Sequence, residues 1–199
     1  MKIELILNRI ESLIYYLFKF PWYYITLKEL GRHTRIKKPL KIEGYKNIAI
    51  GSNAVIGKFS WLAAVNLTDK KSFLKIGSGC RIGNLNHIFA TSSIIIEDNV
   101  LTADKVYISD NQHTYDSINI PILKQDIKQL NEIRIGEGTW IGENVCIIGA
   151  SIGKNCVIGA NSIVNKNIPD YCVAVGSPAK VIKKYCFEKK TWIRINSII

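Results

Sequence analysis

The residue best suited to chemistry in this chain is His113, which stands in a polar stretch, SDNQHTYDSINIPILKQDIKQLNEI, at residues 109–133. Imidazole has an ordinary pKa of about 6.5, so near neutral pH it can accept a proton from a hydroxyl group that attacks an acyl donor. A regular repeat flanks the stretch on both sides and stops inside it. Because a long polar break in a repeat array is commonly functional, we interpret residues 109–133 as a loop that carries a general base.

Aliphatic residues recur every six positions on both sides of this loop, and most are followed by glycine. The pairs are Ile50-Gly51, Ile56-Gly57, Ile76-Gly77, Ile82-Gly83, Ile135-Gly136, Ile141-Gly142, Ile152-Gly153 and Ile158-Gly159. Two residues before the aliphatic positions the side chains are small or β-branched, and this set comprises Ala54, Ser60, Cys80, Val100, Val106, Val145, Ala150, Cys156 and Ser162. A period of six matches neither a helix nor one alternating strand. It predicts short strands joined by turns and stacked into a parallel β-helix, an all-β fold.

The repeat predicts three parts in the chain. Residues 46–184 form the β-helix, and residues 185–199 form a C-terminal tail. Residues 1–45 hold aliphatic side chains at helical spacing from Ile3 to Leu17, followed by an aromatic stretch with Pro21. We expect an amphipathic helix that ends near Pro21, covers the open end of the β-helix and leads into a basic connector. Docking at a membrane interface is the alternative role of this helix, and the two roles are compatible.

Composition and charge narrow the functional class. The 199 residues suit one domain, and the net charge of +11 favours an anionic partner. The apolar N-terminal run is too short to span a membrane and lacks a signal-peptide cleavage site, so we expect a cytoplasmic protein, either free or peripheral at the inner face of the membrane. The five cysteines form no metal-ligand spacing, which predicts structural thiols and no metal site. The basic residues are not interleaved with stacking aromatics, so nucleic acid is not an expected partner.

The glycine hexads, the loop with its histidine and the segment from Trp140-Ile141-Gly142 to Gly176-Ser177-Pro178-Ala179-Lys180 resemble the hexapeptide-repeat acyltransferases. The similarity is closest to the maltose and galactoside O-acetyltransferases and the polysaccharide O-acetyltransferases, and it covers roughly residues 48–184. It implies a left-handed β-helix and a homotrimer with acetyl-coenzyme A bound between subunits. It further implies transfer of acetyl to a hydroxyl of a saccharide used in surface polysaccharide assembly.

The resemblance also implies a role for individual residues. His113 matches the family's catalytic histidine, and the backbone N–H of Glu143 matches the group that stabilises the oxyanion. The coenzyme-binding positions, of which the two lysines meet phosphate groups, are Trp140, Gly142, Ala160, Lys166 and Lys180. No acetyl-enzyme is expected, because no cysteine stands in a nucleophile context.

Acceptor contacts are less well marked by the sequence. Asn84, Asn86 and Asp110 are the candidates for binding the acceptor, and Asp110 or Glu132 is also expected to orient His113. The chain departs from the family at two positions, because Asn111 replaces a second histidine of polysaccharide-modifying relatives and Thr91 replaces an acceptor-binding aspartate.

Two other functions fit the repeat. One is an N-acetyltransferase that acts on an amino sugar, and the other is a non-catalytic β-helix that serves as a scaffold or binding protein. A carbonic anhydrase of the same fold requires three clustered histidines, and His33 and His87 do not have that spacing. The retained His113 and the coenzyme lysines favour the enzyme over the scaffold.

Overall fold

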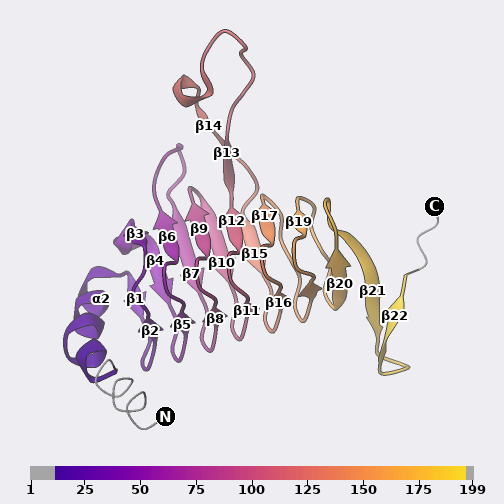
Figure 1. The fold of residues 1–199 in the computed structure, drawn as a ribbon, viewed down its shortest axis with the longest axis horizontal. Coiled ribbons are helices and arrows are strands. Elements are labelled where there is room, and N and C mark those ends of the chain that lie inside the picture. Colours follow the sequence, from indigo (N-terminus) through magenta and orange to yellow (C-terminus); the bar gives the residue numbers. More distant parts are fainter. Residues whose placement is uncertain (1–11, 196–199) are drawn as a thin grey trace.

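The computed structural model describes residues 12–195, and most of them form a left-handed parallel β-helix (Figure 1). Successive strands run around three sheets, and each of the first five coils adds one strand to each sheet. The later coils reach sheet A only through isolated bridges at Ile152 and Ile168. One N-terminal helix covers the first coil, and one long arm projects from the middle of the array (Figure 1). The aliphatic positions predicted between residues 3 and 10 lie outside the described residues.

The three sheets share the same stacking order along the axis. Sheet A contains β1 (Glu29–Leu30), β4 (Ile48–Ile50), β7 (Phe73–Ile76), β10 (Ser93–Ile96) and β15 (Ile133–Ile135). Sheet B contains β2 (Arg35–Ile36), β5 (Val55–Ile56), β8 (Arg81–Ile82), β11 (Leu101–Thr102), β16 (Trp140–Ile141), β18 (Val157–Ile158), β20 (Cys172–Val175), β21 (Lys180–Cys186) and β22 (Thr191–Arg194). Sheet C contains β3 (Lys41–Glu43), β6 (Trp61–Ala64), β9 (His87–Ala90), β12 (Tyr107–Ser109), β17 (Cys146–Ile148) and β19 (Ile163–Val164).

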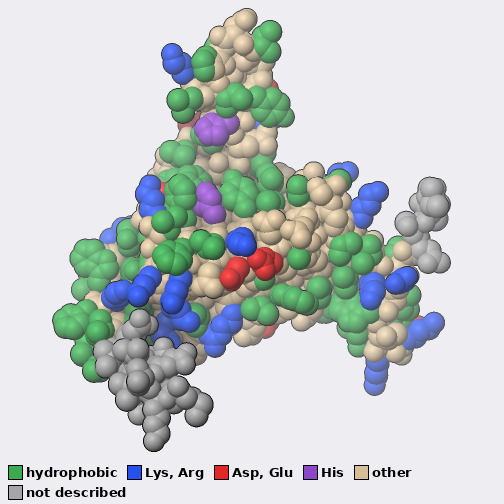
Figure 2. Space-filling model, viewed as in Figure 1, with side chains coloured by type: hydrophobic (Ala, Val, Ile, Leu, Met, Phe, Trp, Pro, Cys, Tyr) green, Lys and Arg blue, Asp and Glu red, His purple; other side chains and the backbone are tan. Residues whose placement is uncertain are grey.

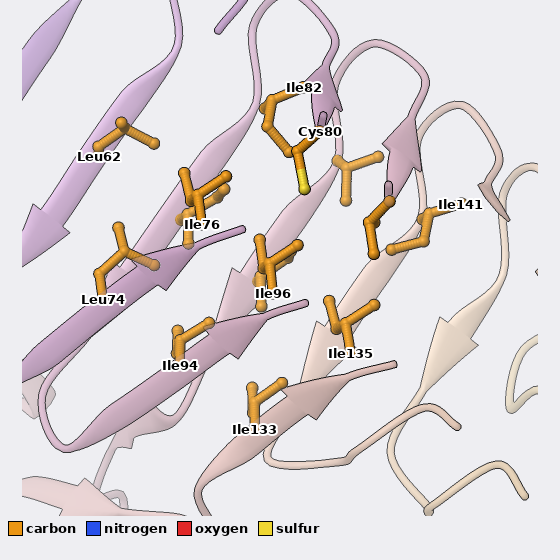
Figure 3. Packing of buried hydrophobic residues seen from close by; sticks show 14 of the residues in the cluster. Leu62, Leu74, Ile76, Cys80, Ile82, Ile94, Ile96, Ile133, Ile135 and Ile141 are labelled. Carbon is orange, nitrogen blue, oxygen red and sulfur yellow. The ribbon is translucent and has the colours of Figure 1, made fainter. Parts of the chain in front are cut away.

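The hexad positions build the interior, as the sequence predicts. Ile76, Ile96 and Ile135 occupy the same register position in three successive strands of sheet A, and all three are buried (Figure 3). Burying one such side chain stabilises the fold by about 1.5–3 kcal/mol. The nine small or β-branched residues of the repeat are buried as well. The β-helix prediction is therefore confirmed, down to which residues point inward.

Buried cysteines in this interior are packing residues. Burial raises the pKa of the Cys80 thiol to about 11, and it also raises the pKa of Cys156 and Cys172. A thiol that stays protonated is a poor nucleophile. All five cysteines are free, and within residues 12–195 no group of histidine, cysteine or acidic side chains is placed to hold a metal ion.

The β-helix begins earlier than the sequence interpretation places it. The segment expected to be a basic connector before residue 46 forms a complete first coil of β1, β2 and β3, which pair in parallel with β4, β5 and β6. Leu30, Ile36 and Ile42 are buried and lie six residues apart. The repeat signal was present here, but the many lysines and arginines on the outward positions obscured it.

The N-terminal helix runs past Pro21, which corrects the expectation that it ends there. A π-helical segment, η1 (Tyr15–Lys19), leads directly into α2 (Phe20–Thr26), and Pro21 lies in the first turn of α2. The N–H of Phe20 donates to the oxygen of Tyr15, five residues back. This wider turn accommodates the proline ring, and a first-turn position does not need the N–H that proline lacks.

One face of this helix is fixed to the first coil. The side chains of Tyr15, Tyr23 and Leu27 join the hydrophobic core, and the Tyr15 hydroxyl accepts a hydrogen bond of 3.1 Å from the Ile36 N–H. The helix therefore covers the open end of the array, which is the first of the two roles considered from the sequence.

The C-terminal segment continues sheet B. β21 pairs antiparallel with β20, and β22 pairs antiparallel with β21. The boundary expected at residue 184 therefore falls inside a strand. The ring of Trp192 packs edge-on against Tyr185, with 5.4 Å between the ring centroids, and holds the last strand in place.

Candidate active site

Residues 110–132 form a hairpin arm that projects from the β-helix directly after β12, a central strand of sheet C (Figure 1). β13 (Asn111–His113) pairs antiparallel with β14 (Ile127–Gln129). Towards the tip, which includes a short 3₁₀ turn, the Gln125 side-chain amide donates a hydrogen bond of 2.7 Å to the Ile120 oxygen. The break in the repeat is therefore an ordered arm with its own strand pair.

A buried carboxylate anchors this arm to the preceding coil. The side chain of Asp110 is fully buried, and its two oxygens accept hydrogen bonds of 2.8 Å from the backbone N–H groups of Thr91 and Ser92. Gln129, on the returning strand, donates to the Asp110 backbone oxygen at 2.7 Å. Charge-assisted bonds of this kind are worth about 1.5–3 kcal/mol each. The structure thus gives Asp110 a positioning role at the base of the arm instead of the predicted contact with the acceptor.

His113 lies on the exposed part of the arm, opposite Ile127 in the strand pair. It is three residues beyond Asp110, so the rise of about 3.3 Å per residue places it about 10 Å from the base. Asp110 binds the coil below, and Glu132 accepts a bond of 3.5 Å from Ser92 at the same base. Neither acid orients His113, and within residues 12–195 its imidazole makes no hydrogen bond. The imidazole is therefore open to a substrate.

A second group of predicted residues meets at the corner between sheets B and C. Trp140 in β16 is half-exposed, and the chain turns directly after it at Gly142 and Glu143. A Cβ atom on Gly142 would lie 2.6 Å from the backbone nitrogen of Ala160 in the next coil. Glycine is therefore required at residue 142 for the coils to stack, and this close approach brings Glu143 and Ala160 together.

The turns along this corner share a ladder of side-chain caps that stops before the candidate site. The N–H of Lys58 donates to Asn84 Oδ1 at 2.8 Å, and the N–H of Asn84 donates to Asp104 Oδ1 at 2.7 Å. The next residues in this column are Glu143 and Ala160. Alanine offers no acceptor, and within residues 12–195 the Glu143 N–H donates to no protein group. An unpaired donor on a fixed turn is what an oxyanion requires.

The two predicted phosphate ligands lie beyond this corner, towards the C-terminus. Lys166 follows β19, and Lys180 opens β21 opposite Val175. Both side chains are exposed, and neither forms an ion pair within the described part of the chain. Free ammonium groups at these positions are suited to meet phosphate as point charges.

The asparagines predicted to bind the acceptor serve the coil. Asn86 is buried, its side-chain amide donates to the Ala103 oxygen at 3.0 Å, and its side-chain oxygen accepts from Thr102 at 3.1 Å. Asn84 belongs to the cap ladder. Asparagine commonly takes such structural roles in turns, and these contacts leave Asn86 without a free polar group on the surface.

The arm and the corner lie at opposite ends of the strands of sheet C. The corner with Glu143 precedes β17, whereas the arm follows β12, the strand paired with β17 in the same sheet. His113 and the Glu143 N–H of one chain are therefore separated by at least the length of a strand of sheet C. Sequence reasoning also missed Gln129, which locks the arm; only its place opposite Asn111 in the hairpin reveals it.

Comparison with known proteins places the chain in a family. Residues 132–166 match the model described as the hexapeptide repeat of succinyl-transferase. An Escherichia coli protein assigned to lipopolysaccharide biosynthesis as an O-acetyl transferase is 33% identical over 164 residues, which cover 79% of this chain and 82% of that protein. The chain belongs to the hexapeptide-repeat acyltransferases. The family recognised from the sequence is thereby confirmed, and with it the assignment to acyl-transferring enzymes.

Further relatives agree with this family. The galactoside O-acetyltransferase of Escherichia coli is 33% identical over 73% of this chain and 71% of its own length. A Mycobacterium tuberculosis protein assigned as an acetyltransferase is 34% identical over 82% of this chain, which spans only 58% of that relative's length. A solved N-acyltransferase mutant from Bacillus cereus, with dTDP and coenzyme A bound, superposes with a TM-score of 0.71 over 85% of this chain and 89% of its own, at 21% identity, and shares the fold.

Proposed function

We propose that this protein transfers acetyl from acetyl-coenzyme A to a hydroxyl group of a saccharide used in surface polysaccharide assembly. The observation that carries the proposal is the open N–H of Glu143, at the point where the ladder of side-chain caps stops. Exposed Lys180, opposite Val175 at the end of β20, and exposed Lys166, after β19, add charge suited to the phosphates of the cosubstrate. The small side chain of Ala160 leaves room beside the N–H for a pantetheine arm.

The reaction proceeds by direct attack. The acceptor oxygen bonds to the thioester carbonyl carbon while His113 takes the hydroxyl proton, and the carbonyl oxygen becomes an oxyanion that the Glu143 N–H stabilises. The carbon–sulfur bond then breaks, and His113 returns its proton to the departing thiolate. Acetyl ester and free thiol are the products. The buried thiols take no part, because burial keeps them protonated.

Two copies of the chain supply one active site in this proposal. The imidazole and the open N–H lie at opposite ends of the strands of sheet C in one chain. The arm of one copy therefore delivers His113 to the Glu143 corner of its neighbour. A cyclic trimer, as implied by the family resemblance, gives three equivalent sites of this kind.

Subunit mixing tests the proposal. One variant, His113→Ala, removes the base, and a second, Ala160→Asn, is designed to place an acceptor on the Glu143 N–H. Each homotrimer should be nearly inactive. Trimers refolded from an equal mixture contain some sites with an intact arm from one subunit and an intact corner from the other, so about one quarter of the wild-type activity should return.

Thiol release from acetyl-coenzyme A with a panel of neutral and amino saccharides is the readout. Mixed refolding of each variant with itself is the control, and sedimentation confirms that mixing changes composition and not assembly. Activity that does not recover on mixing would refute the shared site. Turnover only with amino sugars would replace the O-acetyltransferase with an N-acetyltransferase.

A further inference from the structure

The N-terminal helix of this protein carries a large apolar surface that the β-helix does not cover. Within residues 12–27 the only charged side chain is Lys19. The burial is one-sided, because the core takes Tyr15 and Tyr23 and leaves most of the other large side chains in solvent. The exposed set, with exposed fractions from 47% to 71%, comprises Leu13, Ile14, Leu17, Phe18, Trp22, Tyr24 and Ile25.

This apolar face is held outward by specific contacts. The Tyr15 hydroxyl accepts from the Ile36 N–H at 3.1 Å, and at the far end of the helix Lys46 Nζ donates to the Ile25 oxygen at 2.9 Å. Burial of the Tyr15 ring raises the pKa of its hydroxyl to about 12, which agrees with a hydroxyl group that is largely shielded from water. Since both ends are fixed, the helix cannot roll its exposed side chains onto the core. The face is a preformed surface.

Positive charge surrounds the same face. From residue 12 to residue 46 there are eight lysines and arginines and two glutamates, a net charge of +6 out of +11 for the chain. Every one of the eight basic side chains is exposed, and they are Lys19, Lys28, Arg32, Arg35, Lys37, Lys38, Lys41 and Lys46. Figure 2 shows the hydrophobic side chains at this end of the molecule with lysine and arginine side chains gathered directly beside them.

We propose that the outward face of the N-terminal helix, together with its basic surround, docks the protein on an anionic phospholipid bilayer. Aromatic and aliphatic side chains enter the headgroup region, and the lysines and arginines meet lipid phosphates. Trp22 and Tyr24 suit this position, because tryptophan and tyrosine combine an apolar ring with a polar edge. Within residues 12–195 no helix is long and apolar enough to cross a bilayer, so the contact is peripheral.

A second copy of the chain is a poorer occupant of this face. Symmetric packing would bring identical basic patches together, and like charges around an interface oppose association. An anionic lipid surface has the opposite sign and no fixed shape. The inference does not depend on the acetyltransferase proposal, because the lipid contact uses none of the residues assigned to the active site.

Co-sedimentation of the full-length protein with lipid vesicles tests the inference. The wild type should bind vesicles that contain phosphatidylglycerol and phosphatidylcholine, and it should bind pure phosphatidylcholine at least tenfold more weakly. Raising the salt concentration should weaken the binding, since the charged part is screened. Phe18→Ser with Trp22→Ser should lower the partition coefficient tenfold or more, because each substitution removes a large apolar side chain from the lipid. Leu67→Ser, on an exposed loop elsewhere, is the matched control and should bind as the wild type does.

A depth measurement separates lipid insertion from charge attraction alone. Brominated phospholipids should quench the fluorescence of Trp22, and Trp22→Phe should bind the vesicles normally but lose this quenching. Sedimentation velocity and turnover of a soluble acceptor should not change in the Phe18 and Trp22 double variant. Equal vesicle binding by the double variant and the wild type would overturn the inference. Loss of the oligomer in the double variant, with no vesicle binding by the wild type, would also overturn it and assign the face to a subunit interface.

Discussion

Ala160→Asn is the substitution that most directly tests the assignment of the oxyanion donor. Asn84 Oδ1 lies 2.8 Å from the Lys58 N–H one coil below it, and residue 160 has the same relation to Glu143. The residue after each of these positions, Leu85 or Asn161, has the same left-handed φ near 60°. An asparagine at residue 160 should therefore accept a hydrogen bond from the Glu143 N–H without altering the turn.

The effects on stability and on turnover should have opposite signs. A new side-chain hydrogen bond on a formerly open donor should stabilise the fold by about 0.5–1.5 kcal/mol. Loss of one oxyanion donor should raise the activation free energy by about 2.7–4 kcal/mol and lower kcat by roughly 10²–10³-fold. The urea midpoint and steady-state thiol release measure the two effects on the same preparation.

Two control variants separate the donor from simple bulk. Ala160→Leu places a side chain of similar size beside the coenzyme but leaves the N–H open, so it should affect binding more than kcat. Glu143→Asn places the same amide one coil earlier, opposite Asp104, and keeps the backbone donor of residue 143; it breaks only the exposed ion pair with Lys105, which is worth little. A loss of turnover in Ala160→Asn no larger than that in Ala160→Leu would refute the assignment of the Glu143 N–H as the oxyanion donor.

Three further outcomes follow from the structure. His113→Ala should lower kcat by about 10²–10⁴-fold and leave calorimetric binding of coenzyme A unchanged; near wild-type turnover would place the base elsewhere. Lys180→Ala should raise the KM for acetyl-coenzyme A roughly threefold to tenfold, whereas Lys189→Ala, on the exposed turn before β22, should not; equal values would make Lys180 a solvated residue. Burial raises the pKa of Tyr15 to about 12 and of Cys80 to about 11, so the folded state holds these protons more tightly than the unfolded state does. Stability should therefore be complete below about pH 9 and decline as the pH rises towards 11–12, with a shallower decline in Cys80→Ala; a urea midpoint that does not change between pH 8 and pH 11 would contradict this.

Sequence reasoning recovered the interior of the molecule and missed parts of its ends. Ile135 and Ile141 were assigned to the core because a β-helix repeats the same environment every six residues, and both are buried. The first coil was missed, although Leu30 and Ile36 keep the period, because lysines and arginines occupy many of its outward positions and the segment reads as a basic connector. Pro21 was taken as a helix end because its effect depends on the hydrogen-bond pattern of the preceding turn, which composition does not show.

The amino-acid sequence by itself determined the architecture and the residue types available for chemistry. A six-residue period requires stacked coils, because each coil leaves backbone groups and aliphatic side chains that only another coil can satisfy. The tertiary structure alone decided which polar groups remain open. Asp110 is used at the base of the arm and Asn86 inside a coil, whereas the Glu143 N–H has no partner because Ala160 stands in the next coil. That distinction depends on contacts between residues about 20 positions apart, which a local pattern does not encode. The same holds for the separation of His113 from Glu143 across sheet C, which follows from strand order.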